Sequence, residues 1–236
     1  DGGVGSQTPG RVTPDRMSST LPPNPIDLSW DHNSHYHGHL LRHLPPRCTR
    51  ALDVGCGGGR FARALAVRGV GVDAIDPSPR MISLARRTTP PRLPVDYRAV
   101  SLEEADPTPG EYGFVSAVSS VHHMPFGPSL ERMAAALAPG GTLAILGLYR
   151  EEGVADRVAG LAALGPEWAV GVGLRLGRVL TGVPDPSRVG GMARMPVRDA
   201  RMSLREIAGE AAERLPGARL RRLLFWRYSL VYTRPA

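Results

Sequence analysis

The sequence predicts an α/β domain in which a mostly parallel sheet carries helices on both faces. Three observations support this fold class: short apolar strands alternate with helical segments, a glycine-rich loop follows the first strand, and two strands close the chain. Strands that alternate with helices form parallel sheets, because each helix returns the chain to the same end of the sheet. The 236 residues suffice for one such domain with an insertion.

The alternation begins at residue 51. Strands are expected at Ala51–Val54, Val70–Ile75, Val95–Val100, Phe114–Ser119 and Thr142–Leu148, with helices at Arg60–Arg68, Met81–Arg87 and Leu130–Leu137. A capping box of Ser203 and Glu206 begins a further helix. Two strands at Arg219–Phe225 and Tyr228–Thr233 should be antiparallel, because the connection between them is tight. Together these segments predict a doubly wound, Rossmann-like, mostly parallel seven-stranded sheet with an antiparallel C-terminal hairpin.

Two segments fall outside this alternation. Residues 1–25 are rich in Gly, Pro, Ser and Thr, so we expect a flexible tail ahead of a single domain over residues 26–236. Residues 151–202 are longer than an ordinary connection, with helices expected near 152–164 and 167–181. We interpret this insertion as a lid or substrate element, and its alternative is an ordinary pair of amphipathic helices on the sheet.

Composition narrows the function classes. No apolar run is long enough for a transmembrane helix, and we expect no signal peptide. Cys48 and Cys56 are too few for a disulfide framework and fit a reducing cytoplasm. All 29 basic residues are arginine, and they are spread along the chain. We therefore expect a cytoplasmic protein that has no nucleic-acid or membrane partner and uses no lysine chemistry.

The strongest motif is the loop after the first strand, which reads Asp-Val-Gly-Cys-Gly-Gly-Gly-Arg from Asp53 to Arg60. Glycines at this place let a ligand approach the backbone, although a tight turn into the next helix is the alternative. A dinucleotide fingerprint starting at Gly55 would need a glycine where Arg60 stands. The carboxylate of Asp53 would also repel phosphate, so the loop favours a ligand with an ammonium group.

A second acid supports a ligand at this edge. Asp76 ends the second expected strand, about 20 residues beyond the glycines, where a carboxylate can accept hydrogen bonds from ribose hydroxyls. The alternative role is a cap for the next helix, which Ser78 could supply equally well. Together with the glycine loop, the position favours the ligand role.

Four segments in this order resemble the class I S-adenosylmethionine-dependent methyltransferases, in particular the small-molecule, methyltransferase type 11-like members. The matching segments are Asp53–Gly59 for D/E-x-G-x-G-x-G, Asp76–Met81 for D-x-S-P-x-M, Ser119–Met124 for the H-H-L segment, and Pro139–Leu143 for P-G-G-x-L. The resemblance implies S-adenosyl-L-methionine as cofactor and a small molecule, such as a natural product, as methyl acceptor. No metal is expected, because no acidic partner motif accompanies the histidines of the chain.

The resemblance also implies a set of site residues. The expected cofactor-binding residues are Tyr36, Asp53, Gly55, Cys56, Gly57, Gly59, Asp76, Pro77, Met81, Ser101, Leu102, Ser119 and Val121. The family often has Gly-Asp after strand three, where this chain has Val100-Ser101. The backbone of Leu102, or the side chain of Ser101 or Glu103, would then contact the adenine amino group.

The histidines form two clusters. Five lie in the stretch Asp31–Leu44, which reads as a short helix: His32, His35, His37, His39 and His43. This stretch has three interpretations: a solvated polar face, a metal site built on pairs such as His35 and His39, or a lid over the cofactor with Tyr36 or a histidine facing it.

The second cluster is His122 and His123, just past the fourth strand. His122 is the candidate general base, because the unperturbed pKa of histidine, near 6.5, lies close to neutrality. His123 better suits a packed loop residue.

Three rival functions remain open from the sequence. An NAD(P)-dependent oxidoreductase is disfavoured by Arg60, and a base-amino methyltransferase by Ser119–His122, where [N/D]-P-P-[Y/F] would be expected. A non-catalytic S-adenosylmethionine-binding protein is the third, because methyl transfer does not always need a catalytic side chain.

Overall fold

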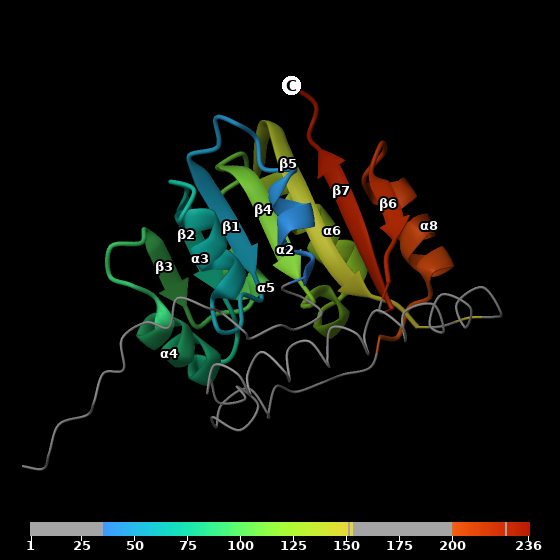
Figure 1. Cartoon of the computed structure of the whole chain (residues 1–236). Helices are drawn as coiled ribbons and strands as arrows, with labels where there is room; N and C mark the ends of the chain where they lie inside the picture. Colours follow the sequence, from blue (N-terminus) through green and yellow to red (C-terminus); the bar gives the residue numbers. More distant parts are fainter. Residues whose placement is uncertain (1–34, 151, 153–199, 225) are drawn as a thin grey trace, which may run out of the picture.

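The computed structural model describes residues 35–150, 152, 200–224 and 226–236 (Figure 1). The strands are β1 (Arg50–Val54), β2 (Gly71–Ile75), β3 (Val95–Arg98), β4 (Tyr112–Val118), β5 (Leu137–Leu148), β6 (Arg219–Arg222) and β7 (Arg227–Thr233). The helices are α2 (His37–Leu41), α3 (Arg60–Ala66), α4 (Pro79–Thr88), α5 (Leu102–Ala105), α6 (Phe126–Ala136) and α8 (Leu204–Arg214), together with a 3-10 helix, η1 (Val121–His123).

The described strands form one seven-stranded sheet in the order β3-β2-β1-β4-β5-β7-β6. Strands β1 to β5 are parallel, and β7 is antiparallel to both β5 and β6. This confirms the predicted fold class, including the C-terminal hairpin. The strand order reverses between β1 and β4, which is where open α/β sheets bind ligands.

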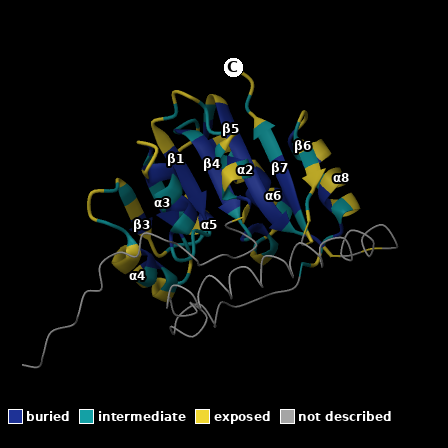
Figure 2. Cartoon of the chain, viewed as in Figure 1, coloured by how far each residue is buried: buried dark blue, intermediate teal, exposed yellow. Residues whose placement is uncertain are grey.

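Two hydrophobic layers cover the two faces of the sheet. The layer under α2, α3 and α4 includes Leu40, Phe61, Leu65, Ile82 and Leu146. The layer under α6 and α8 includes Leu52, Leu130, Met133, Ile145 and Ile207. Figure 2 shows the central strands buried and the outer sides of the helices exposed. Burial on both faces explains why the central strands are almost continuously apolar.

The starts of α6 and β5 differ most from the sequence prediction. Helix α6 begins at Phe126, four residues before the predicted Leu130, and ends at Ala136. Pro128 is tolerated because it lies in the first helical turn, where its missing N–H has no partner to lose. Leu137 belongs to β5 and not to the helix, because it pairs with Tyr112 on β4.

The helix α5 was not predicted. Ser101 is its N-cap, and a capping box links Ser101 with Glu104. The same S-x-x-E pattern that correctly predicted the start of α8 at Ser203 therefore occurs here too. The signal was in the sequence, but four helical residues produce no apolar period.

The segments outside the alternation are only partly described. Helix α2 falls within the predicted Asp31–Leu44 stretch and packs against α3 and β5. The predicted tail over residues 1–25 and the helices near 152–164 and 167–181 lie outside the described residues, apart from Glu152. In the described part of the chain, no helix is both long and apolar enough to cross a membrane.

Candidate functional site

Most of the predicted site residues gather at one edge of the sheet. The glycine loop follows β1, Asp76 follows β2, and η1 follows β4, so all three lie at the carboxyl ends of parallel strands (Figure 1). The loop and η1 flank the point where the strand order reverses. This is the expected place for a ligand in an open α/β sheet.

Backbone hydrogen bonds attach the glycine loop to β2. The N–H groups of Gly55 and Cys56 both donate to the carbonyl oxygen of Ile75, at 2.8 and 2.9 Å. The N–H of Gly57 donates to Oδ2 of Asp76 at 2.9 Å. The loop conformation is therefore fixed by the neighbouring strand before any ligand arrives.

Two of the motif glycines are required by packing within the chain itself. Gly55 and Gly59 have φ values of 68° and 75°, which favour glycine. A Cβ at Gly55 would lie 2.3 Å from Cβ of Ser120, and one at Gly59 would lie 2.2 Å from the hydroxyl oxygen of Tyr97. The sequence reasoning attributed these glycines to ligand approach and close helix packing, with a tight turn as the alternative, and it missed Tyr97 and Ser120 as the residues that demand them.

Asp76 links the glycine loop to the start of α4. Its Oδ2 accepts from Gly57, and its Oδ1 accepts from the N–H of Ser78 at 2.9 Å. The helix cap itself is Ser78, whose Oγ accepts from the N–H of Met81 at 3.4 Å. Asp76 is thus free of the capping role, and each carboxylate oxygen keeps a lone pair for a further donor. Pro77 is exposed beside it, and Met81 is half-buried.

Asp53 lies beneath the glycine loop and is 1% exposed. Its Oδ1 accepts a hydrogen bond from the hydroxyl of Ser116 at 2.8 Å, while Oδ2 is buried with no hydrogen-bond partner among the described residues. Burial raises the pKa of Asp53 to about 7, and the bond from Ser116 opposes that rise. A ligand's ammonium group would need a local opening of the loop to reach this carboxylate directly.

The thiol of Cys56 is not a nucleophile in this setting. Burial raises its pKa, and the nearby carboxylates of Asp53 and Asp76 raise it further. The thiol therefore stays protonated at neutral pH, and only the thiolate is nucleophilic. The role of Cys56 in the loop is structural, through the hydrogen bonds of its backbone with Ile75 and Gly59.

After β3, the hydroxyl of Ser101 accepts from the N–H of Glu104 at 3.2 Å, and its own N–H donates to Oε2 of Glu104 at 2.8 Å. Leu102 is buried in the core beside it, and Glu103 is exposed. Capping therefore already uses the Ser101 side chain that was expected to contact adenine.

The end of β4 is tightly held. Ser119 has a φ of 53° and donates its N–H to the carbonyl of Leu146 on β5 at 2.7 Å. The hydroxyl of Ser120 donates to the carbonyl of Val54 on β1 at 2.7 Å. Val121 is buried. These bonds fix the direction in which the chain enters η1.

His122 lies in η1 and is half-buried. Its Nδ1 is buried without a hydrogen-bond partner in the described part of the chain, and its ring lies 3.9 Å from that of His123. Burial lowers the pKa of His122 to about 4, helped by the charges of His123 and Arg227. His122 is therefore neutral at physiological pH and can accept a proton, but it is a weaker base than the sequence suggested.

Tyr36 reaches the same edge from α2. It is buried, and its hydroxyl donates to the carbonyl of Leu224 in the turn between β6 and β7 at 3.3 Å. Burial raises the pKa of Tyr36, and the charge of Arg227 partly opposes this. Sequence reasoning missed Leu224 and Arg227, which no motif marks.

His39 of α2 contacts the sheet. Nε2 of His39 is 3.0 Å from Oγ of Ser229 on β7, and its Nδ1 is 3.0 Å from a guanidinium nitrogen of Arg42. The rings of His39 and His43 pack edge to face at 5.3 Å. Within residues 35–150, 152, 200–224 and 226–236, no group of three or more His, Cys, Asp or Glu side chains could hold a metal ion. His32 lies outside these residues.

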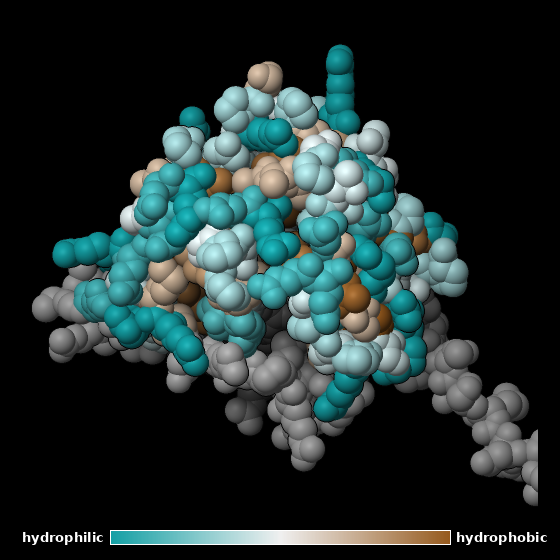
Figure 3. All heavy atoms as spheres, turned by 180° about the vertical axis from the view of Figure 1, so that it is seen from behind, coloured by the Kyte–Doolittle hydropathy of each residue, from teal (hydrophilic) through white to brown (hydrophobic). Residues whose placement is uncertain are grey.

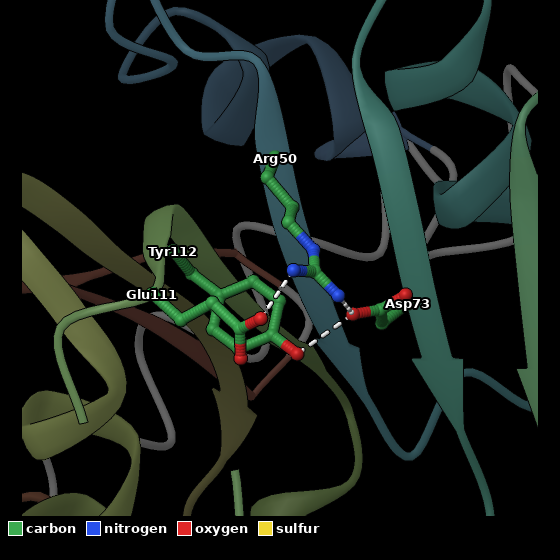
Figure 4. Close-up of polar contacts among 4 residues, drawn as sticks. All are labelled: Arg50, Asp73, Glu111 and Tyr112. Carbon is green, nitrogen blue, oxygen red and sulfur yellow. Dashed lines mark hydrogen bonds and ion pairs between the residues drawn. The ribbon is translucent and has the colours of Figure 1, made fainter. Parts of the chain in front are cut away.

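A different polar cluster occupies the opposite, amino edge of the sheet (Figure 4). Asp73 accepts from a guanidinium N–H of Arg50 at 2.9 Å and from the hydroxyl of Tyr112 at 2.7 Å, both at Oδ2. Arg50 also pairs with Glu111. An open cavity of about 490 Å³ lies beside this cluster, and another of about 550 Å³ lies between α3 and the end of α4. Neither cavity is at the carboxyl edge.

Comparisons with known proteins agree with this arrangement. Residues 51–141 match the family model of a methyltransferase domain. A ubiquinone biosynthesis O-methyltransferase of Bordetella bronchiseptica is 43% identical over 95 residues, which are 39% of this chain and 39% of that protein. One from Chromobacterium violaceum is 31% identical over 156 residues, covering 65% of this chain and 66% of that protein. This chain thus spans about two fifths of the length of the first relatives it matches.

Two solved structures share the fold over most of the chain. One is the methyltransferase in complex with the Trm112 activator of Haloferax volcanii, with a TM-score of 0.58, 18% identity, and coverage of 86% of this chain and 90% of that one. The other is the 1,6-didemethyltoxoflavin-N1-methyltransferase of Burkholderia thailandensis with bound S-adenosylhomocysteine. Its TM-score is 0.53 at 16% identity, with coverage of 86% of this chain and 78% of that one.

Proposed function

We propose that this chain, which belongs to the class I S-adenosylmethionine-dependent methyltransferases, transfers a methyl group to a hydroxyl of a small-molecule acceptor. The cofactor would bind at the carboxyl edge of β1, β2 and β4. The hydroxyl as acceptor group is supported by the O-methyltransferase names of the relatives from Bordetella bronchiseptica and Chromobacterium violaceum, which match only parts of their length.

The observation that carries this proposal is the arrangement of Asp76. Both of its carboxylate oxygens accept backbone N–H groups, from Gly57 and Ser78, so the carboxylate is held rigidly beside the glycine loop. A carboxylate accepts hydrogen bonds from hydroxyls, and two oxygens match the two hydroxyls of a ribose. The bound analogue in the Burkholderia thailandensis enzyme carries such a ribose.

The residues present fit S-adenosylmethionine better than a dinucleotide. Half-buried Asp76 binds the loop and buried Asp53 lies beneath it, and carboxylates favour a cationic ligand over a pyrophosphate. Arg60 stands where the dinucleotide fingerprint requires glycine. We assign the cofactor to the glycine loop and to the residues that follow β2, β3 and β4, with Pro77, Met81, Leu102, Ser119 and Val121 lining its adenosine and methionine parts.

When bound, the cofactor would supply an electrophilic methyl group on its sulfonium. The chain's own residues would align the acceptor and remove its proton. Alignment alone supplies a large part of the acceleration in such a displacement. We assign the proton acceptor role to the neutral imidazole of His122, which follows the end of β4.

The test of the cofactor assignment is isothermal titration of the full chain. We expect S-adenosylmethionine or S-adenosylhomocysteine to bind in the micromolar range, about −8 kcal/mol, and NAD to show no binding. Tight binding of NAD without S-adenosylmethionine would overturn the proposal. Methyl transfer to a panel of hydroxyl acceptors separates an enzyme from a non-catalytic cofactor binder. Activity that is lost to a chelator and restored by a divalent metal would reinstate the metal interpretation of the amino-terminal histidines.

A further inference from the structure

The turn between β6 and β7 lies at the same edge of the sheet as the glycine loop. Strand β7 runs antiparallel to β5, and its first residue, Arg227, pairs with Leu148 at the carboxyl end of β5. The described residues of this turn, Leu223, Leu224 and Trp226, therefore lie at the carboxyl edge, where Figure 1 shows the junction of the two red strands. No sequence motif assigned a role to it.

Trp226 occupies an unfavourable backbone position in this turn. The hairpin closes through a hydrogen bond from the N–H of Leu223 to the carbonyl of Arg227 at 2.8 Å. Trp226 has a φ of 55°, a left-handed conformation that glycine and asparagine adopt easily and bulky residues rarely adopt. A large aromatic residue thus occupies a left-handed position where hairpin turns favour glycine or asparagine. Such violations concentrate at ligand sites.

The turn also exposes apolar surface. Leu224 is 39% and Trp226 37% exposed, and Val67 at 70% is the other large hydrophobic residue exposed in the described part of the chain. The face behind the sheet, by contrast, shows mainly hydrophilic residues with small separate apolar spots (Figure 3). Two exposed apolar residues in one short turn are therefore a local feature of this edge.

The turn lies between two predicted site residues. The carbonyl of Leu224 accepts the hydrogen bond from Tyr36 on α2. The charge of Arg227, next to Trp226, acts on His122 and on Tyr36. The turn thus contacts Tyr36 directly, and its last residue Arg227 is near enough to lower the pKa of His122, the proton acceptor of the proposed reaction.

We propose that Trp226, flanked by Leu224, is the surface on which an aromatic ring of the acceptor stacks. This inference rests on the proposed function and narrows its acceptor class to aromatic hydroxyl compounds. Stacking on an indole holds a flat ring in one plane while leaving its hydroxyl free to meet the methyl group. A saturated ring of the same size gains much less from that surface.

The test uses the full chain saturated with S-adenosylhomocysteine, with catechol and trans-1,2-cyclohexanediol as probes in isothermal titration. We expect catechol to bind and the diol to bind at least about tenfold more weakly, because only the aromatic ring stacks. Trp226→Asn should weaken catechol binding about tenfold and leave S-adenosylhomocysteine affinity unchanged. Trp226→Phe should restore most of the catechol affinity.

Stability separates a binding role from a structural one. Asparagine accepts the left-handed conformation, so the relief of backbone strain should offset the lost packing, and Tm of Trp226→Asn should stay close to that of the native chain. The control is Val67→Asn, which removes exposed apolar surface elsewhere and should not change catechol binding.

Three results would overturn the inference: equal binding of catechol by the native chain and Trp226→Asn, binding of neither ring, or parallel losses of Tm and affinity that Trp226→Phe does not restore. Failure of S-adenosylhomocysteine to bind would instead overturn the proposed function, so the two failures are distinguishable.

Discussion

Asp53 on β1 and Asp73 on β2 lie on neighbouring strands but have opposite surroundings. Asp73, at the amino edge, accepts hydrogen bonds from Arg50 and Tyr112 (Figure 4). Asp53, near the carboxyl edge, has one hydroxyl donor, from Ser116, and a buried oxygen without a partner in the described residues. A cation and a hydroxyl satisfy the first acid, while the second is buried and incompletely satisfied.

The difference teaches how to separate structural from functional acids in this fold. An acid that a cation of the chain neutralises, as Arg50 does for Asp73, joins strands together and offers little to a ligand. An incompletely satisfied acid is unfavourable for folding and persists where a ligand or a reaction needs it. Five predictions test whether this distinction between the two edges holds.

The largest effect is expected at His122. If His122 accepts the acceptor's proton, His122→Ala should lower turnover about 10²–10⁴-fold with little change in cofactor affinity. Because the base must be unprotonated and burial lowers its pKa to about 4, kcat/KM should stay level down to about pH 5 and fall as the pH approaches 4. Steady-state kinetics over that range measures both effects.

The control for His122 is its neighbour. His123→Ala should be much milder, because His123 is exposed and lies one residue further from β4. Two variants that behave alike, each costing less than about tenfold or roughly 1.4 kcal/mol of barrier, would show that neither residue is the base.

Asp53 should make stability depend on pH. Its pKa is about 7 in the folded chain against an ordinary value of 3.8, so the folded state holds the proton more tightly than the unfolded state. The contribution of Asp53 to the free energy of unfolding should therefore be greatest below about pH 4. It should fall by up to about 4 kcal/mol as the pH rises to 7. Asp53→Asn, which keeps an oxygen for Ser116, should flatten this part of the pH profile in denaturant titrations. An unchanged profile would mean that Asp53 stays charged when buried.

Alanine substitutions at the neighbouring glycines 58 and 59 should lower the free energy of unfolding by very different amounts. Gly59→Ala combines a left-handed backbone with a Cβ 2.2 Å from the hydroxyl of buried Tyr97, so it should cost about 2–4 kcal/mol of unfolding free energy. Gly58→Ala is the matched control, because its Cβ would lie 3.5 Å from Leu84, an ordinary contact. It should cost less than about 1 kcal/mol. Equal costs in thermal unfolding would show that the loop adjusts freely.

Replacing Asp76 should weaken cofactor binding more than it lowers the stability of the fold. Asp76→Ala should weaken S-adenosylmethionine binding by about 1.5–3 kcal/mol, the range for hydrogen bonds to a charged group. Ser78→Ala removes the cap of α4 and should cost about 1 kcal/mol of stability with little change in affinity. Titration calorimetry and thermal unfolding of both variants should give opposite patterns. A stability loss with unchanged affinity for Asp76→Ala would make Asp76 structural, like Asp73.

The smallest effect is expected at the amino edge. Tyr112→Phe removes one donor to Asp73 but leaves Arg50 in place, so it should cost about 1 kcal/mol of stability. Cofactor affinity should not change, because the cluster lies at the opposite edge from the glycine loop. A measurable loss of affinity in calorimetry would contradict the separation of the two edges.

The sequence by itself determined the layout of this protein. Alternating apolar strands and helices predicted the parallel order, and the tight connection before Tyr228 predicted the antiparallel hairpin. The glycine loop and Asp76 came to one edge as expected, because the carboxyl ends of parallel strands meet there. These features were predictable because each depends on residues close together in the chain.

The tertiary structure decided what each residue is free to do. The reason for glycine at 59 is Tyr97, which is 38 residues away, and Ser101 was expected at adenine but caps α5. The low pKa of His122 and the place of Trp226 depend on burial and on a strand pairing between β5 and β7. The burial of a side chain, its steric contacts and the charges around it depend on which distant segments of the chain pack together. Short sequence patterns do not contain that information.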